Sequence, residues 1–298
     1  MQEIKFENII VQPVVKSFSA EKNISVSVLR LDLLHPVISG NKWFKLRFYI
    51  DEAKRLHKKR IITYGGAWSN HIIATACACS QNKLNAVGII RGEERAEYSE
   101  TLKAAKDFGM EFIFLNRKEY QNKTLPLIPD TENDYIIPEG GYGIKGAEGF
   151  STALDYCNKN EFTHFACAAG TGTMMAGLIK TAAKEQQVVG ISVLKNNYDL
   201  LPAVNSLLTE NEKLKKFELV QDYHFGGYAK STSELLQFMN SFYSESSIPT
   251  DFVYTGKLFY AVTNLAEKNY FPAGSKILVI HSGGLQGNSS LKKGTLIF

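Results

Sequence analysis

The sequence predicts an α/β protein whose parallel sheets are covered by helices. Short apolar segments alternate with amphipathic segments along most of the 298 residues, and glycine-rich turns follow several of the apolar segments. Strand-then-helix units of this kind pair their strands in parallel. The chain is 44% hydrophobic and 21% charged, which is typical of an ordinary soluble protein with one large core or two smaller ones.

Charge and composition argue against several classes of partner. The net charge of +4 is small and evenly spread, so it does not indicate nucleic-acid binding. No apolar run reaches the roughly 18 to 20 residues of a membrane span, and the first residues lack a signal-peptide pattern. The four cysteines and six histidines lack metal-ligand spacing. We therefore expect a cytoplasmic protein without a metal and without a nucleic-acid or membrane partner.

The first half of the chain reads as a series of strands and helices. A strand begins near Ile24, continues to Leu34 and leads to a turn at Ser39, after which apolar residues at helical spacing continue to Leu56. The next predicted strands are 60–64, 86–91 and 111–115, and the next helices are 70–81 and 96–108. The polar segment 116–134 holds two prolines and reads as a connection, and a strand at 135–137 then runs into a glycine-rich loop.

The second half repeats the same alternation. The predicted helices are 147–159, 174–184, 200–215, 233–244 and 257–268. The predicted strands are 165–168, 188–194, 217–220 and 276–281. Two such sets of units place a ligand in the crevice between two sheets, at the carboxyl ends of their strands.

Lys42 is the leading candidate for chemistry. It stands in the segment Ser39-Gly40-Asn41-Lys42, at a glycine-broken turn before a helix, and we interpret it as an amine that forms an imine with an aldehyde. Lys45 lies three residues on, so both ammonium groups project from one face at the helix end that repels cations. That placement is unfavourable unless an anion binds there. A single lysine after Gly-Asn is nevertheless more often solvated than catalytic.

Three glycine-rich turns could receive the anion or other parts of a ligand. Turns 65–70 and 169–173 each follow a strand and open a helix, so glycine backbone, hydroxyls and helix amides face the same space. The second is the better phosphate cradle, whereas Ser69 or Asn70 in the first could be a plain helix N-cap. The third turn, 281–284, could meet the edge of a ring or simply stabilise the chain reversal.

An amine combined with a phosphate cradle indicates pyridoxal phosphate. A nicotinamide enzyme would use the cradle but not the amine, and the sequence lacks a GxGxxG fingerprint with a properly spaced acidic residue. Pyridoxal phosphate needs both, because its aldehyde binds a lysine, its phosphate docks at a helix N-terminus and its ring withdraws electrons.

Six segments in register give the chain a specific resemblance. They are 39–42 with 45–46, then 69–71, 137–141, 170–173, 253–257, and 271–272 leading to 282–284. In these segments the chain resembles the 1-aminocyclopropane-1-carboxylate deaminases and D-cysteine desulfhydrases, of the tryptophan-synthase-β-like class (fold type II) of pyridoxal phosphate enzymes. The resemblance implies a homodimer of subunits with two three-layer α/β domains and mostly parallel sheets. Residues 1–50 and 145–298 would form the larger, cofactor-binding domain, and 51–144 a smaller inserted domain.

The resemblance also implies how the cofactor is held. Lys42 would bind it covalently and Asn70 would bond its ring oxygen. Lys45 would help hold the phosphate, together with the residues of the second glycine-rich turn, Gly170, Thr171, Gly172 and Thr173. The candidate partners of the pyridine nitrogen are Thr255, where the deaminase pattern has a glutamate, and Ser282.

Other matching residues would face the substrate. Ser69 would meet the substrate carboxylate or act on the substrate directly, and Tyr254 and Tyr228 would flank the reacting carbon. Tyr228 matches only through the pair Gly227-Tyr228, so a packed aromatic side chain is the alternative reading.

The differences within the resemblance bear on the substrate. Hydroxyl partners do not enforce a protonated ring nitrogen as a carboxylate does, which favours elimination of a good leaving group over opening a carbon ring. His71 is likewise the desulfhydrase-like residue. Trp68, Trp43 and Phe44 replace smaller or more polar residues and predict extra bulk beside the pocket, and Ile73 stands where an arginine is usual.

We therefore predict a lyase that acts on a small amino acid in the manner of D-cysteine desulfhydrase, releasing pyruvate, ammonia and sulfide. Lys42 would remove the α proton as a general base. Deamination of 1-aminocyclopropane-1-carboxylate to 2-oxobutanoate and ammonia is the first alternative. A non-catalytic amino-acid or phosphate-binding module is the second, and synthase chemistry with a second nucleophile is a third.

Overall fold

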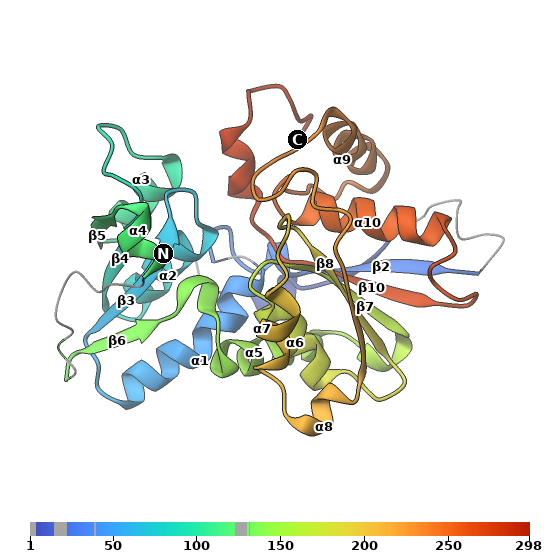
Figure 1. Ribbon diagram of the computed structural model, residues 1–298, viewed down its shortest axis with the longest axis horizontal. Helices are drawn as coiled ribbons and strands as arrows, with labels where there is room; N and C mark the ends of the chain where they lie inside the picture. Colours follow the sequence, from blue (N-terminus) through green and yellow to red (C-terminus); the bar gives the residue numbers. More distant parts are fainter. Residues whose placement is uncertain (1–3, 15–22, 39, 123–129, 131) are drawn as a thin grey trace.

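The computed structural model describes residues 4–14, 23–38, 40–122, 130 and 132–298. These residues contain two sheets that lie side by side, each flanked by helices (Figure 1). The two sheets confirm the predicted α/β class. The division of the chain into domains at residues 50 and 145 remains a prediction.

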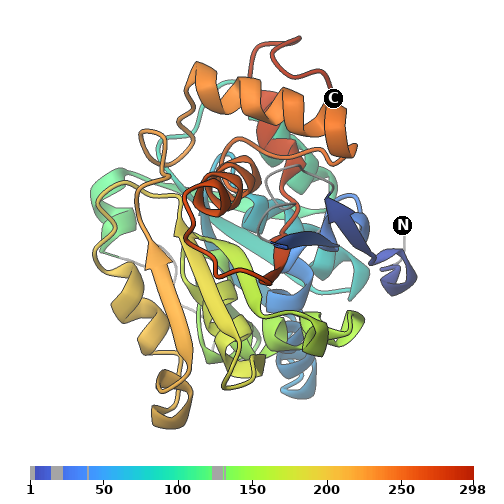
Figure 2. The same cartoon turned by 90° about the vertical axis from the view of Figure 1, so that its right-hand side faces the viewer.

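The larger sheet has six strands, and five of them run parallel. Its order is β1 (Val11–Val14), β2 (Ser25–Arg30), β10 (Lys276–His281), β7 (His164–Ala169), β8 (Gln187–Ser192) and β9 (Lys216–Val220). Only β1 pairs antiparallel, against β2. Figure 2 shows β1 and β2 at one edge of this sheet and β9 at the other.

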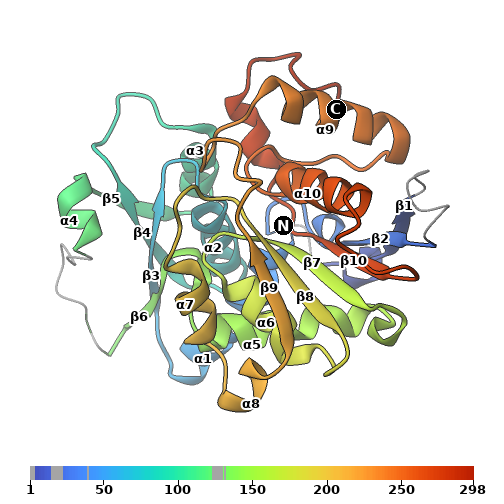
Figure 3. The same cartoon turned by 45° about the vertical axis from the view of Figure 1, so that its right-hand side comes forward.

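Helices cover both faces of the larger sheet (Figure 3). One face packs against α5 (Ile144–Ser151) and α6 (Thr173–Thr181), and the other against α9 (Ser233–Ser246) and α10 (Thr255–Glu267). Alternate residues of β10 serve the two cores, since Leu278 lies with α5 and α6 and Val279 with α10. The short helices α7 (Leu200–Asn205) and α8 (Glu210–Lys213) precede β9.

The smaller sheet has four parallel strands. Its order is β5 (Met110–Leu115), β4 (Asn85–Arg91), β3 (Arg60–Gly66) and β6 (Asp134–Ile137). The helices α2 (Asn70–Gln81) and α3 (Glu100–Asp107) cover one face, and Tyr120 of α4 (Arg117–Gln121) packs on the other.

Helix α1 (Asn41–Arg55) joins the two cores. Phe44 is fully buried with α5 and α6 of the larger sheet, whereas Leu46, Ile50 and Ala53 pack with α2 in the smaller one. The helix therefore fixes the first turn, which carries Lys42, relative to both sheets.

Several predicted elements differ from the observed ones. The strand predicted to reach Leu34 ends at Arg30, because Arg30 and Asp32 pair and a 3-10 turn occupies Leu31–Leu33. The predicted helix 200–215 is two helices, because Thr209 forms a capping box with Glu212 and starts α8 there.

Two other helix predictions have shifted ends. The helix predicted at 96–108 starts at Glu100, because Ser99 caps it through the amide of Leu102. The helix predicted at 147–159 spans Ile144–Ser151 instead. Strand β1 and helix α4 were not predicted, and α4 lies inside the segment read as a connection. The rest of that segment falls largely outside the described residues, as does Ser39.

None of the helices in the described ranges is long and apolar enough to cross a membrane. In the same residues, no group of three or more His, Cys, Asp or Glu side chains is arranged to bind a metal ion.

The position of Phe44 gives a stability prediction. Phe44→Ala should lower the free energy of unfolding by about 3–5 kcal/mol, because it removes a fully buried ring that contacts Phe150 and Tyr156. Urea unfolding followed by circular dichroism measures the change. Phe48→Ala, at a partly exposed position of the same helix, is the control and should have a smaller effect. Equal losses would contradict the buried position of Phe44.

Candidate active site

A cavity of about 310 Å³ lies between the two sheets. Its walls come from the loops that follow strands β3, β4, β6, β7, β8 and β10, and from the first turns of α1 and α2. This is the location predicted from the sequence, because parallel strands of both sheets direct their carboxyl ends toward it. Ten of the twelve predicted site residues line the cavity: Lys42, Lys45, Ser69, Asn70, Gly170, Thr171, Gly172, Tyr228, Tyr254 and Ser282.

Close backbone contact places Lys42 in this cavity. A Cβ atom on Gly40, whose φ is +62°, would lie 1.8 Å from the carbonyl oxygen of Ser282, so only glycine allows this approach. The next amide, of Asn41, donates to the same oxygen at 3.3 Å. The start of α1 is thereby held against the turn after β10, and Lys42 follows directly.

Burial changes the acid–base properties of both lysines. Desolvation lowers the pKa of Lys42 to about 8, although the negative charge of Asp251 opposes the change. Burial, followed by the charge of Lys42, lowers the pKa of Lys45 well below its usual value. The first turn of α1 therefore favours neutral amines or a bound anion that compensates their charge.

The second glycine-rich turn has the form of an anion cradle. Gly170, Thr171 and Gly172 line the cavity where β7 ends and α6 begins. Gly172 has a left-handed φ of +81°, and a Cβ atom there would lie 2.7 Å from Val204, so the backbone stays bare. Amide groups at the start of a helix lack intrahelical partners and attract phosphate. Thr173 does not line the cavity; it is fully buried, with its hydroxyl 3.1 Å from that of Thr171.

Ser69 and Asn70 stand at the start of α2 and also line the cavity. The Ser69 hydroxyl accepts a hydrogen bond from the amide of His71 at 3.2 Å, so it caps the helix and also faces the cavity. The Asn70 side-chain oxygen is buried and has no hydrogen-bond partner in the described part of the chain. Because an unpaired buried amide oxygen is unfavourable, this side chain is suited to a ligand in the cavity.

His71 is a neutral acceptor beside the two lysines. The Thr63 hydroxyl donates to the carbonyl of Ile137 at 2.8 Å, so His71 Nε2 must donate to Thr63 Oγ1, also at 2.8 Å. Nδ1 then carries a lone pair, and it is buried without a partner among the described residues. Burial and the charges of Lys42 and Lys45 keep the pKa of His71 well below its usual value.

Two tyrosines line the cavity next to each other. The rings of Tyr228 and Tyr254 meet edge to face, with centroids 6.2 Å apart. Burial raises the pKa of both phenols, and for Tyr254 the neighbouring Tyr228 and Asp251 raise it further. Both side chains therefore remain protonated and can donate hydrogen bonds. Tyr228 is 43% exposed and lines the cavity, and its ring also packs on Tyr254.

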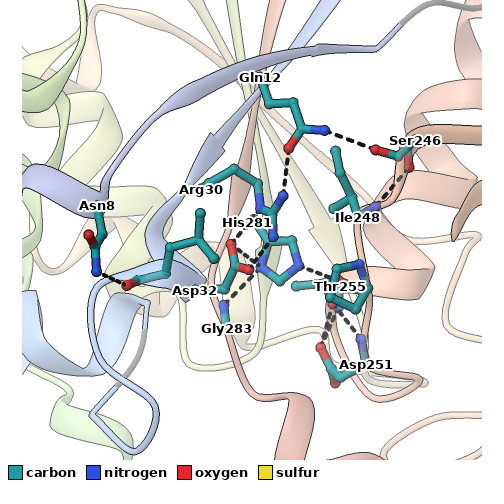
Figure 4. Close-up of polar contacts among 12 residues, drawn as sticks. Asn8, Gln12, Arg30, Asp32, Ser246, Ile248, Asp251, Thr255, His281 and Gly283 are labelled. Carbon is teal, nitrogen blue, oxygen red and sulfur yellow. Dashed lines mark hydrogen bonds and ion pairs between the residues drawn. The ribbon is translucent and has the colours of Figure 1, made fainter. Parts of the chain in front are cut away.

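Thr255 lies outside the cavity lining, contrary to the ring contact predicted from the sequence. Its hydroxyl donates to Asp251 Oδ1 at 2.7 Å and accepts from the Asp251 amide at 2.7 Å (Figure 4). The other oxygen of Asp251 accepts the amides of Val253 and Tyr254, so this buried carboxylate caps α10. Of the two residues predicted beside the ring nitrogen, only Ser282 lines the cavity.

A buried ionic network holds the turn that carries Ser282 (Figure 4). Arg30 forms two hydrogen bonds with Asp32, at 2.9 and 2.7 Å, and Asp32 lies 3.3 Å from His281 Nδ1. The same nitrogen is 3.2 Å from the amide of Gly283, and His281 Nε2 lies 2.7 Å from the carbonyl of Pro249. The sequence did not predict this network, because its members come from opposite ends of the chain.

The aromatic residues that were predicted to narrow the pocket lie elsewhere. Phe44 is in the core and Trp43 packs beside it, because both lie on the face of α1 that is turned away from the cavity. Trp68 is 43% exposed and lines a separate pocket of about 210 Å³. That pocket shares Arg91 with the main cavity, and neither Arg91 nor Glu139 was predicted as a lining residue.

Together these features fit pyridoxal phosphate. The cavity offers an amine of lowered pKa, a bare helix N-terminus and an unpaired amide. Lys42 would hold the cofactor aldehyde and Asn70 its ring oxygen, with the phosphate at 170–173 and Lys45 nearby. These roles are proposals from position and chemistry.

Known proteins resemble the chain over most of its length. A family model described as pyridoxal-phosphate dependent enzyme matches residues 6–283. A protein of Pyrococcus horikoshii, provisionally named as a 1-aminocyclopropane-1-carboxylate deaminase, is 31% identical over 91% of this chain and 88% of its own length. The mitochondrial bifunctional D-cysteine desulfhydrase/1-aminocyclopropane-1-carboxylate deaminase of Arabidopsis thaliana is 30% identical over 87% of this chain and 72% of its own. A crystal structure described as an ACC deaminase homologue superposes with a TM-score of 0.82 at 28% identity, covering 94% of this chain and 90% of the other.

The buried charge of Lys42 gives a pH-dependent stability prediction. Because its folded pKa of about 8 lies below its ordinary 10.5, the unfolded chain binds more protons between these values. The ammonium therefore destabilises the cofactor-free protein at pH 7, and this penalty falls as pH rises through 8. Lys42→Met should raise the melting temperature at pH 7 by a few degrees, with a smaller gain at pH 10. Lys292→Met, at an exposed position, is the control; the same pH dependence in both variants would exclude a buried charge at Lys42.

Proposed function

The chain belongs to the pyridoxal-phosphate dependent enzyme family, and from this premise we propose that it eliminates a β substituent from a small amino acid. The model substrate is D-cysteine, with pyruvate, ammonia and sulfide as products. The observation that carries this proposal is that Lys42 lines the same cavity as Asn70, whose buried side-chain oxygen has no partner in the described part of the chain. Pyridoxal phosphate supplies an electron-withdrawing ring that stabilises negative charge at the substrate α carbon.

The side chains around the cavity supply the remaining steps. The Lys42 amine, with its pKa near 8, is suited to take the α proton at physiological pH, since a general base works best near the ambient pH. Ser69, which lines the cavity, would bind the substrate carboxylate. Tyr254 and Tyr228, which remain protonated, can donate hydrogen bonds to the substrate or to the leaving group.

The lining favours elimination over cyclopropane ring opening. Among the described lining residues, Glu139 is the acidic one. It follows β6 of the smaller sheet, whereas Ser282, the residue predicted beside the ring nitrogen, follows β10 of the larger sheet. A serine hydroxyl does not enforce protonation of a ring nitrogen, so it provides a weaker electron sink than a carboxylate. Sulfide is a good leaving group and suits the weaker sink.

Deamination of 1-aminocyclopropane-1-carboxylate is the second candidate. The names of the Pyrococcus and Arabidopsis relatives favour it, and the Arabidopsis name joins both activities. Two observations disfavour the non-catalytic binding module. The chain belongs to a family of enzymes, and binding alone does not require the lowered pKa of the Lys42 amine.

A substrate assay separates these candidates. Purified protein loaded with pyridoxal phosphate should release sulfide and pyruvate from D-cysteine, and at a higher rate than it releases 2-oxobutanoate from 1-aminocyclopropane-1-carboxylate. Lys42→Ala should abolish both the yellow absorbance of the lysine-bound cofactor and turnover. Lys54→Ala, at an exposed position of the same helix, is the control. Keto acid from the cyclopropane substrate alone would reverse the order of the two candidates, and keto acid from neither would refute the proposal.

The quaternary structure and compartment are also proposals, taken from the family resemblance and the sequence. We propose a cytoplasmic homodimer. Light scattering of the loaded protein should give a mass about twice that of the 33.3 kDa chain. The mass of a single chain, constant over a hundredfold concentration range, would contradict a dimer.

A further inference from the structure

The loop that carries Tyr228 has an unfavourable backbone conformation. Between β9 and α9, four residues have positive φ: Phe225 (48°), Gly226 (90°), Gly227 (112°) and Ala229 (51°). Phe225 and Ala229 have side chains, for which this region of φ is rarely populated. A loop with this backbone keeps its shape only if contacts from elsewhere hold it.

One face of α10 provides those contacts. The positions involved are three or four residues apart, so they share a side of the helix: 254, 257, 260 and 264. Far from the cavity, the Tyr223 hydroxyl donates to Asn264 Oδ1 at 2.9 Å, and Phe225 packs on Tyr260 with centroids 4.9 Å apart. Nearest the cavity, Tyr228 meets Tyr254. The 223–228 loop therefore runs antiparallel to α10.

Lys257 makes the charged contact of this series. Its ammonium group donates to the carbonyl oxygens of His224 at 2.9 Å and Gly227 at 2.7 Å. The residue is completely buried, and no carboxylate lies within ion-pair distance in the described residues, although Asp251 interacts with it at longer range. Gly227 is the residue directly before Tyr228.

A positive charge at the position of Lys257 is energetically unfavourable. It is the third residue of α10, where the helix dipole disfavours a cation, and burial lowers its pKa to about 8. An apolar side chain would fill the same space without that penalty. Compared with an apolar side chain, a lysine at this position adds only the two hydrogen bonds to the loop.

We propose that Lys257 is a positioning residue that holds the 224–228 turn, so that Tyr228 stays against Tyr254 in the lining of the cavity. It acts on the reaction only through Tyr228. The effect on turnover rests on the proposed function, whereas the effect on the loop does not.

Hydrogen–deuterium exchange of the cofactor-loaded protein tests the loop directly. In Lys257→Met, the amides of 224–229 should exchange at least about tenfold faster, while those of 261–267 in α10 keep the wild-type rate. Tyr223→Phe, which removes the hydrogen bond at the far end of the series, is the matched control and should leave 227–229 unchanged. Wild-type exchange of the loop in Lys257→Met would overturn the proposal, as would equal loss of protection along all of α10.

A double-mutant cycle then tests whether Lys257 acts through Tyr228. Lys257→Met should lower kcat about tenfold in the wild-type background and by less than about twofold in the Tyr228→Ala background. An equal loss in both backgrounds would show that Lys257 acts by another route. If the wild type turns over neither candidate amino acid, the proposed function fails, and the exchange experiment alone decides the role of Lys257.

A second variant covers the case in which Lys257→Met does not fold. Gly227→Ala leaves Lys257 in place but opposes the φ of +112° at the residue whose carbonyl Lys257 holds. It should raise exchange at 224–229 and should lower kcat in the wild-type but not in the Tyr228→Ala background. Unchanged exchange and kcat in this variant would show that the turn needs no such restraint.

Discussion

The close contact between Gly40 and Ser282 is the constraint on which the site depends. These residues lie at opposite ends of the chain, yet a single methyl group between them would not fit. The contact joins the first turn of α1 to the end of β10, and α1 in turn packs into both cores. Lys42 therefore has a fixed position relative to the Ser282 turn, the glycine-rich turn after β7 and Asn70 after β3.

Burial of charge without full pairing is the common property of the residues around this contact. Lys42, Lys45 and Lys257 have lowered pKa values because they are desolvated, and the pKa of the Asp251 carboxyl is raised for the same reason. Asp251 is nevertheless held by four hydrogen bonds at the start of α10. Of these groups Lys42 and Lys45 line the cavity, so a bound anion can relieve the unfavourable burial of their charge, and binding sites commonly differ from cores in this way.

Local signals explain which parts of the sequence prediction were accurate. The bounds of α2 and β10 were predicted as observed, because Ser69 caps the helix and apolar residues run without interruption through the strand. The lining residues of the three glycine-rich turns could be predicted because these turns follow strands, whereas Tyr228 and Tyr254 were predicted only from the family resemblance. Contacts between distant segments could not be predicted: Asp32 meets His281 from the opposite end of the chain, and Lys257 binds the carbonyl of Gly227, which lies 30 residues before it. The face of α1 occupied by Phe44 likewise depends on the tertiary fold.

The topology of the larger sheet has a consequence for how the protein forms. β10, which follows every other described strand along the chain, lies in the interior of the sheet between β2 and β7. While a ribosome is still making the segment before residue 276, β2 and β7 have no common neighbour, and their open edges can pair with other chains. Neither the Lys42 turn nor its partner at Ser282 can be in place then. The cavity is thus complete only after β10 has been made and has entered the middle of the sheet.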